Sequence, residues 1–106
     1  MEIIYLPKAE EDLIFWKKSG NIAIKKKIEK LIEDIQINPF SGIGKPEQLK
    51  FQLAGKWSRR INKEHRIIYE VFNESIFIHS LKDHINTSQF SSVKIYNLLS
   101  KIFFNE

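Results

Sequence analysis

Cysteine is absent from this chain of 106 residues, and so are long hydrophobic runs. The lack of cysteine excludes a disulfide framework, a zinc–thiolate site and a cysteine nucleophile, and it fits a reducing compartment. No apolar stretch approaches the roughly 20 residues that a transmembrane helix needs. The opening MEIIYLPKAEED becomes acidic after a short apolar stretch, unlike a secretory signal peptide. We therefore expect a cytoplasmic protein without a membrane partner.

Carboxylates are scarce between residues 44 and 66, although the chain as a whole is only moderately basic, with a formal net charge of +4. Glu47 and Glu64 are the acidic residues of this segment, and its basic residues are Lys45, Lys50, Lys56, Arg59, Arg60, Lys63 and Arg66. Basic charge concentrated on one face is typical of nucleic-acid binding. A basic surface that only keeps the protein in solution is the alternative, and composition leaves both open.

The N-terminal third has the periodicity of one strand and two helices. Residues 2–6 are rich in β-forming side chains and predict a strand that Pro7 ends. Residues 8–18 predict a helix with acids in its first turn. Asn21 is a candidate N-cap for a second helix, which must end before Pro39. The apolar stripe of this helix is Ile24, Ile28, Leu31, Ile32 and Ile35. The lysines of this helix predict a solvated face, with a phosphate-binding face as the alternative. They are Lys25, Lys26, Lys27 and Lys30.

From residue 49 onward the apolar period changes to two. Residues 39–46 are rich in Pro, Gly and Ser and predict a loop before this change. Residues 49–53, 57–61, 65–72 and 75–81 then predict strands of an antiparallel meander. Two helices ahead of such a meander predict an α+β fold, in which the helices cover one face of the sheet and leave the other open.

Alternation along these strands divides their side chains between the two faces. The side chains expected to face the helices are Leu49, Phe51, Ile61, Ile67, Tyr69, Val71, Ile76 and Ile78. Those expected to face away are Lys50, Gln52, Ser58, Arg60, Arg66, Ile68, Phe77 and His79. With a three-residue turn, Arg60 and Arg66 would lie opposite each other. Such a like-charged pair is unfavourable unless an anion such as phosphate lies between the two groups or each finds its own carboxylate.

These residue types suit cleavage of RNA without a metal or cofactor. The 2′-hydroxyl of RNA can attack the neighbouring phosphate if a base removes its proton, an acid protonates the leaving oxygen and cations hold the developing charge. Glu47 is a candidate base, and a histidine is the natural acid at neutral pH. His84 follows the last strand and could reach the open face. His65 has the opposite parity and is expected to be structural, whereas for His79 packing and function remain equally open.

Four segments together resemble the YoeB/Txe toxins of the RelE-like superfamily. They are KPEQLK at 45–50, WSRRI at 57–61, EHRIIY at 64–69 and SLKDH at 80–84, and their order and spacing match the family. The resemblance covers roughly residues 1–85. It implies a RelE-like fold and a small toxin of a toxin–antitoxin module, which cleaves mRNA in the ribosomal A site without a metal or cofactor.

The resemblance also implies roles for individual residues. Glu47 corresponds to the general base and His84 to the general acid, while Arg60 and Arg66 bind the scissile phosphate. Basic residues near the site, expected to bind substrate, are Lys45, Lys50 and Arg59. The implied partners are a cognate antitoxin, mRNA and ribosomal RNA, operator DNA only together with the antitoxin, and a second copy of the chain as a possible homodimer.

The C-terminus departs from the family pattern. Members end with a tyrosine after the final histidine, whereas this chain has Ile85 and continues. Residues 86–106 form a separate extension, predicted as a loop and then an amphipathic helix whose stripe is Ile95, Leu98, Leu99, Ile102 and Phe103. Phe90 or Tyr96 could replace the missing aromatic ring. The alternative is an impaired homologue that acts as an antitoxin-binding or operator co-repressor module.

Overall fold

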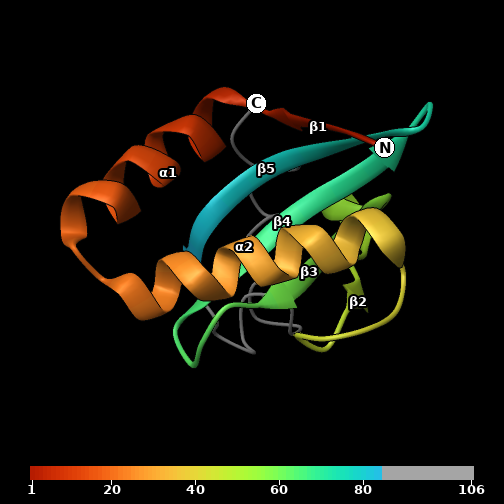
Figure 1. Cartoon of the computed structure of the whole chain (residues 1–106). Coiled ribbons are helices and arrows are strands. Elements are labelled where there is room, and N and C mark those ends of the chain that lie inside the picture. The colour runs from red at the N-terminus through yellow and green to blue at the C-terminus, as the bar shows by residue number, and fades with distance from the viewer. Residues whose placement is uncertain (85–106) are drawn as a thin grey trace.

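The computed structural model describes residues 1–84, which form a five-stranded sheet with two helices packed on one of its faces (Figure 1). The strands lie in the order β1-β5-β4-β3-β2. The core lies between this face and the helices, and its buried side chains come mainly from both helices, β4 and β5. The predicted α+β plan, with two helices on one face of the sheet, is confirmed.

Strand β1, Glu2–Tyr5, leads directly into helix α1, Pro7–Ser19. Pro7 begins the helix, because the missing N–H and the fixed φ of proline suit the first helical position. Two side chains of α1 bind the backbone of Leu81 in the sheet. The Asp12 carboxylate accepts a hydrogen bond from its N–H at 2.9 Å, and the Trp16 indole donates to its carbonyl at 2.8 Å. These bonds fix the helix against the sheet.

Helix α2, Ile22–Ile37, begins at the predicted cap, where Asn21 Oδ1 accepts a hydrogen bond from the N–H of Ile24 at 3.1 Å. It ends at Asn38, directly before Pro39, as the prediction required. Its predicted stripe faces the core, with Ile32 partly buried and the other members fully buried: Ile24, Ile28, Leu31 and Ile35.

Strands β3 (Lys56–Arg60), β4 (His65–Phe72) and β5 (Ser75–His84) are antiparallel neighbours, which confirms the meander. Strand β1 pairs with β5 in parallel orientation, so the complete sheet is mixed. Strand β2, Glu47–Gln48, pairs with β3 at the other edge. The register places one set of residues on the sheet face away from the helices, here called the outer face: Glu47, Lys56, Ser58, Arg60, Arg66, Ile68 and Glu70.

Residues 49–53 do not form the predicted strand. Strand β2 ends at Gln48, and Phe51–Leu53 is a short 3-10 helix instead. Leu49 is buried as predicted, but Phe51 has φ +59° and is 55% exposed. The prediction that Phe51 faces the core is therefore wrong, because the chain turns before the alternation can place it. Lys50 and Gln52, assigned to the outer face, are exposed beside the sheet.

The pairing of β4 with β5 is irregular at two places, between Arg66 and Ile68 and between Ile68 and Tyr69. Side chains along the second half of β5 therefore do not alternate regularly between the two faces of the sheet. The shifts bring Asp83 opposite Arg66 and the backbone of His84 opposite His65.

The predicted extension 86–106, its helix, and the predictions for Ile85, Phe90 and Tyr96 lie outside the described residues. The domain division at residue 85 stays a prediction. Within residues 1–84, no helix has the length and apolarity needed to cross a membrane.

Candidate active site

The turn between β3 and β4 sets the two predicted phosphate-binding arginines opposite each other. Asn62 Oδ1 accepts hydrogen bonds from the N–H groups of Glu64 and His65, both at 2.8 Å, and so closes the turn. In the resulting register, Arg60 of β3 is the direct partner of Arg66 of β4. The predicted cross-strand pair is confirmed. Two guanidinium groups in this position favour an anion between them.

Glu47 reaches this pair from the short strand β2. Its Oε2 lies 3.1 Å from Arg66 Nη1, and the same nitrogen donates to Ser58 Oγ at 2.9 Å. The Arg66 side chain is only 3% exposed, whereas the Glu47 side chain is 52% exposed. The guanidinium is therefore fixed in the protein while the carboxylate beside it stays accessible to solvent.

This arrangement suits a substrate that has a negatively charged group and, next to it, a second group with a proton that can be removed. A guanidinium group can bind two phosphoryl oxygens through parallel N–H groups, and a carboxylate can accept a proton within hydrogen-bond reach. Arg66 can exchange its bond to Glu47 for a bond to an entering phosphate. That exchange leaves the carboxylate free to accept a proton.

Arg59, predicted to bind substrate, points into the interior. Its side chain is 0% exposed, and its five N–H groups make five hydrogen bonds. The acceptors are Tyr69 Oη, Asp34 Oδ2 and the backbone carbonyls of Asn38, Ser41 and Ile43. The surroundings of Arg59 argue against contact with substrate, because all its N–H groups are already bonded and none remains to bind a phosphate. Its role is to hold the loop 38–44 between α2 and the sheet.

The loop network extends through Asp34 and Tyr69. The Arg59 hydrogen bond, followed by one from the N–H of Ile43, lowers the pKa of the Asp34 carboxyl below its ordinary value. Burial raises the pKa of the Tyr69 hydroxyl, which donates to the Pro39 carbonyl at 2.6 Å. Since the loop leads straight into β2, this network positions Glu47 at the edge of the sheet.

Asp34→Asn is expected to make folding stability less sensitive to acid. Because the folded-state pKa of Asp34 is lowered, its carboxylate stabilises the wild-type protein above the unfolded-state pKa of about 4, and this contribution is lost as the pH falls through the folded-state pKa. Near pH 7 the variant should unfold at a lower temperature than the wild type. On acidification its unfolding temperature should fall by less than that of the wild type. Thermal unfolding followed by circular dichroism between about pH 2 and pH 7 measures both effects. Glu33→Gln, an exposed neighbour, is the matched control, and equal acid sensitivity of Asp34→Asn and this control would contradict the expectation.

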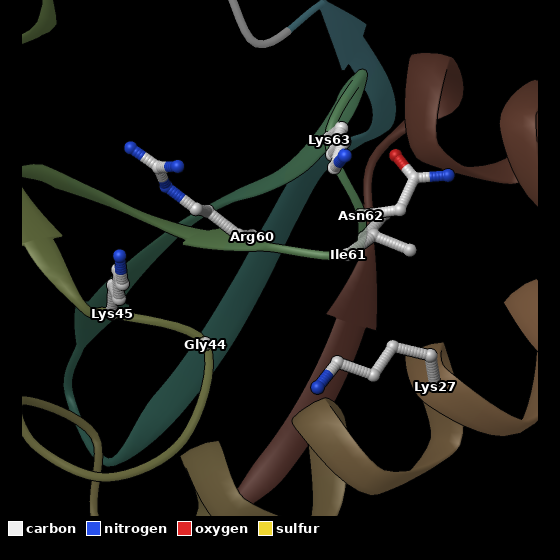
Figure 2. A pocket seen from close by; sticks show the side chains of 7 residues that line it. All are labelled: Lys27, Gly44, Lys45, Arg60, Ile61, Asn62 and Lys63. Atoms are coloured by element: carbon white, nitrogen blue, oxygen red, sulfur yellow. The ribbon is translucent and has the colours of Figure 1, made fainter.

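The other basic residues predicted for the site do not all lie in one place. Arg60 and Lys45 line a hollow at the edge of the outer face, together with the backbone of Gly44, as Figure 2 shows. Lys50 is exposed beside the 3-10 helix and does not line this hollow. Among residues 1–84, no three His, Asp or Glu side chains lie close enough together to hold a metal ion.

The histidines differ in their surroundings. His65 packs edge-on against Trp16 of α1 at 5.0 Å between ring centroids, which agrees with a structural role. His79 Nε2 lies 2.9 Å from Glu70 Oε1, so this histidine has a carboxylate partner on the sheet. His84 is the last residue of β5 and the end of the described chain, and its role as acid stays a prediction.

Two residues beside Arg66 were not predicted as members of the site. Ser58 was placed on the outer face without a role, although its hydroxyl helps fix Arg66. Asp83, the register partner of Arg66, was hidden by the irregular pairing of β5. Serine alternating with Arg60 in WSRRI was the available signal for the first, and the place of Asp83 in the segment SLKDH was the available signal for the second.

Comparison with known proteins gives a family match over residues 5–85, to the YoeB-like toxin of bacterial type II toxin–antitoxin systems. The chain is 42% identical over 84 residues to Toxin YoeB of Escherichia coli K12, which covers 79% of this chain and 99% of that protein. This chain belongs to the YoeB toxin family. The family match ends at residue 85, so the segment 86–106 lies beyond it.

Solved structures of YoeB proteins share the fold. A YoeB/ParE toxin from Agrobacterium tumefaciens superimposes with a TM-score of 0.76 at 35% identity, over 79% of this chain and 99% of that one. YoeB in a YoeB–YefM complex from Staphylococcus aureus gives 0.73 at 44% identity, over 79% and 97% of the two chains. A YoeB dimer from the same organism gives 0.73 at 42% identity, with the same coverage.

Proposed function

We propose that this chain is the toxin of a type II toxin–antitoxin module and that it cleaves mRNA on the ribosome. Membership of the YoeB family supports the first part. The second part rests on one observation: the accessible Glu47 carboxylate lies 3.1 Å from the fixed Arg66 guanidinium, with Arg60 directly opposite Arg66 in the sheet. These groups supply a base and two cations for a phosphodiester.

In the proposed reaction, Arg66 and Arg60 bind the non-bridging oxygens of the scissile phosphate. Glu47 takes the proton of the adjacent 2′-hydroxyl as its oxygen attacks phosphorus. The bond from phosphorus to the 5′-oxygen breaks, and His84 donates a proton to that oxygen. The products are a 2′,3′-cyclic phosphate and a 5′-hydroxyl. The guanidinium groups stabilise the charge that builds on the phosphoryl oxygens, which is where preorganised cations contribute most.

The proposed partners follow from the family and from the charge of the site. An antitoxin is expected to neutralise the toxin, as the YoeB–YefM pairing in the Staphylococcus aureus complex suggests, and operator DNA would be bound only together with that antitoxin. The YoeB dimer from that organism supports a possible homodimer. Ribosomal RNA and mRNA are the nucleic-acid partners, and a cytoplasmic location follows from acting on translating ribosomes.

Primer extension on mRNA from programmed ribosomes tests the proposal. The purified chain should produce discrete cuts at fixed codon positions, because the ribosome presents the message in one register. The reaction should proceed in the presence of EDTA at a concentration that leaves the ribosome intact. Absence of cuts at high protein concentration would reject the enzyme and favour a module that only binds its antitoxin.

A further inference from the structure

The hollow beside the outer face is lined by cations from three separate segments. Lys27 comes from α2, Lys45 from the loop before β2, and Arg60 and Lys63 from the end of β3 and the turn that follows (Figure 2). Gly44, Ile61 and Asn62 complete the wall, and the cavity volume is about 380 Å³. In Figure 2, Lys27 lies on one side of the Gly44 backbone, with Lys45 and Arg60 on the other. This volume lies near the lower end of the range of small-ligand sites, roughly 300–1,000 Å³.

Within the described residues, no carboxylate is in direct contact with the cations of the hollow. Its lining contains no carboxylate, and within residues 1–84 no ion pair joins Asp or Glu to Lys27, Lys45, Arg60 or Lys63. Elsewhere in that part of the chain, Lys8 and Arg59 each contact a carboxylate. Like charges that line one hollow repel one another, and an anion bound there relieves the repulsion.

A backbone hydrogen bond and two unusual φ angles shape the wall of the hollow at residues 44 and 45. The Gly44 carbonyl accepts a hydrogen bond from the Arg60 N–H at 2.7 Å, and a Cβ at Gly44 would come within 2.6 Å of Leu31. Glycine is therefore needed for this close approach and for its φ of +80°. Lys45, which follows, has φ +52°, a conformation that lysine rarely adopts. The backbone thus holds a lysine in a strained conformation at this wall.

We propose that the hollow binds a second phosphodiester, next to the scissile one, on the RNA strand that is cut. The inference rests on the proposed function and extends it, because Arg60 both opposes Arg66 and lines the hollow. A nucleic-acid strand carries one negative charge per nucleotide, so it can fill two neighbouring cationic positions in succession. A groove of positive charge that follows the backbone is the usual way to bind a single strand.

The double variant Lys27→Gln/Lys63→Gln tests the site without touching Arg60. Binding of a short fluorescent single-stranded RNA is measured by anisotropy over a range of salt concentrations. Loss of one phosphate contact should reduce the slope of log K against log salt by about 0.7. Lys18→Gln/Lys26→Gln removes the same charge from exposed positions outside the hollow and is the matched control. Equal slopes for the two double variants would overturn the proposal. Failure of the wild-type protein to bind the RNA at all would overturn it as well.

Uncharged methylphosphonate linkages placed one at a time in the mRNA locate the contact. On programmed ribosomes, one position beside the cut should weaken cleavage by the wild-type chain and have no further effect on Lys27→Gln/Lys63→Gln. If the lysine variant loses affinity but no mRNA position reproduces that loss, the phosphate belongs to ribosomal RNA and the assignment to the cut strand is wrong. RNA binding through the hollow without any cleavage would reject the proposed function and leave the phosphate site standing.

Discussion

Arg66→Ala is expected to abolish growth inhibition when the protein is produced in cells. The guanidinium is buried, fixed by Ser58 and Glu47, and placed opposite Arg60, so no other side chain of the described site can replace its charge at the same point. Loss of one preorganised group that stabilises developing charge typically costs about 10²–10³-fold in rate. Single-turnover cleavage on programmed ribosomes should fall by at least about 100-fold.

Separate variants distinguish loss of chemistry from loss of fold for Arg66. Arg66→Lys keeps the charge but loses the planar fork, and we expect activity between that of the wild type and Arg66→Ala. Lys56→Ala removes a cation of the same outer face that makes no ion pair with Glu47 and should remain toxic. Thermal unfolding of each variant checks that the sheet is intact. An Arg66→Ala protein that is folded and fully toxic would reject the site assignment.

Glu47→Gln is expected to lower single-turnover cleavage by about 10²–10⁴-fold, the usual contribution of a positioned proton-transfer group. The amide retains the size of the side chain but cannot accept the proton of the 2′-hydroxyl. Glu47 is half exposed and lies on a strand of two residues, so this substitution should have little effect on folding. A rate close to that of the wild type would show that another group, or positioning alone, activates the hydroxyl.

The pH dependence gives Glu47 a second readout within the same prediction. A reaction with one base and one acid declines on both sides of an optimum. In Glu47→Gln the decline on the acidic side should disappear, while the decline on the basic side remains. The double variant Glu47→Gln/Gln48→Glu moves the carboxylate to the neighbouring residue. Because that side chain points to the opposite face of the strand, the double variant should not regain the wild-type rate. Restoration would contradict the geometric requirement.

The positions of Arg60 and Arg66 on the outer face could be predicted because they depend only on local periodicity. Arg60 and Arg66 flank a short turn in two strands with strong alternation, so their parity and their direct opposition could be predicted. The second helix was equally clear, since Asn21 and Pro39 mark its ends. The family resemblance then indicated roles for Glu47 and the two arginines, and the structure brings these three residues together.

Properties that depend on distant contacts could not be predicted. Arg59 follows Ser58 in a basic segment and looked like a substrate-binding residue, but its acceptors lie on α2 and on the loop after it. Residues 49–53 alternate like a strand, but the chain turns after Gln48 and forms a 3-10 helix at Phe51–Leu53. The basic hollow combines Lys27 with Lys63, which lie far apart in the sequence, and only the tertiary fold brings them together.

The parallel pairing of β1 with β5 has a consequence for synthesis of the toxin. The first strand to leave the ribosome has to wait for Ser75–His84, the last strand described, before its hydrogen bonds can form. Such high contact order slows folding, and the nascent chain cannot complete its sheet beforehand. A polypeptide interrupted before residue 75 should therefore lack the partner strand of β1 and be unable to complete the sheet.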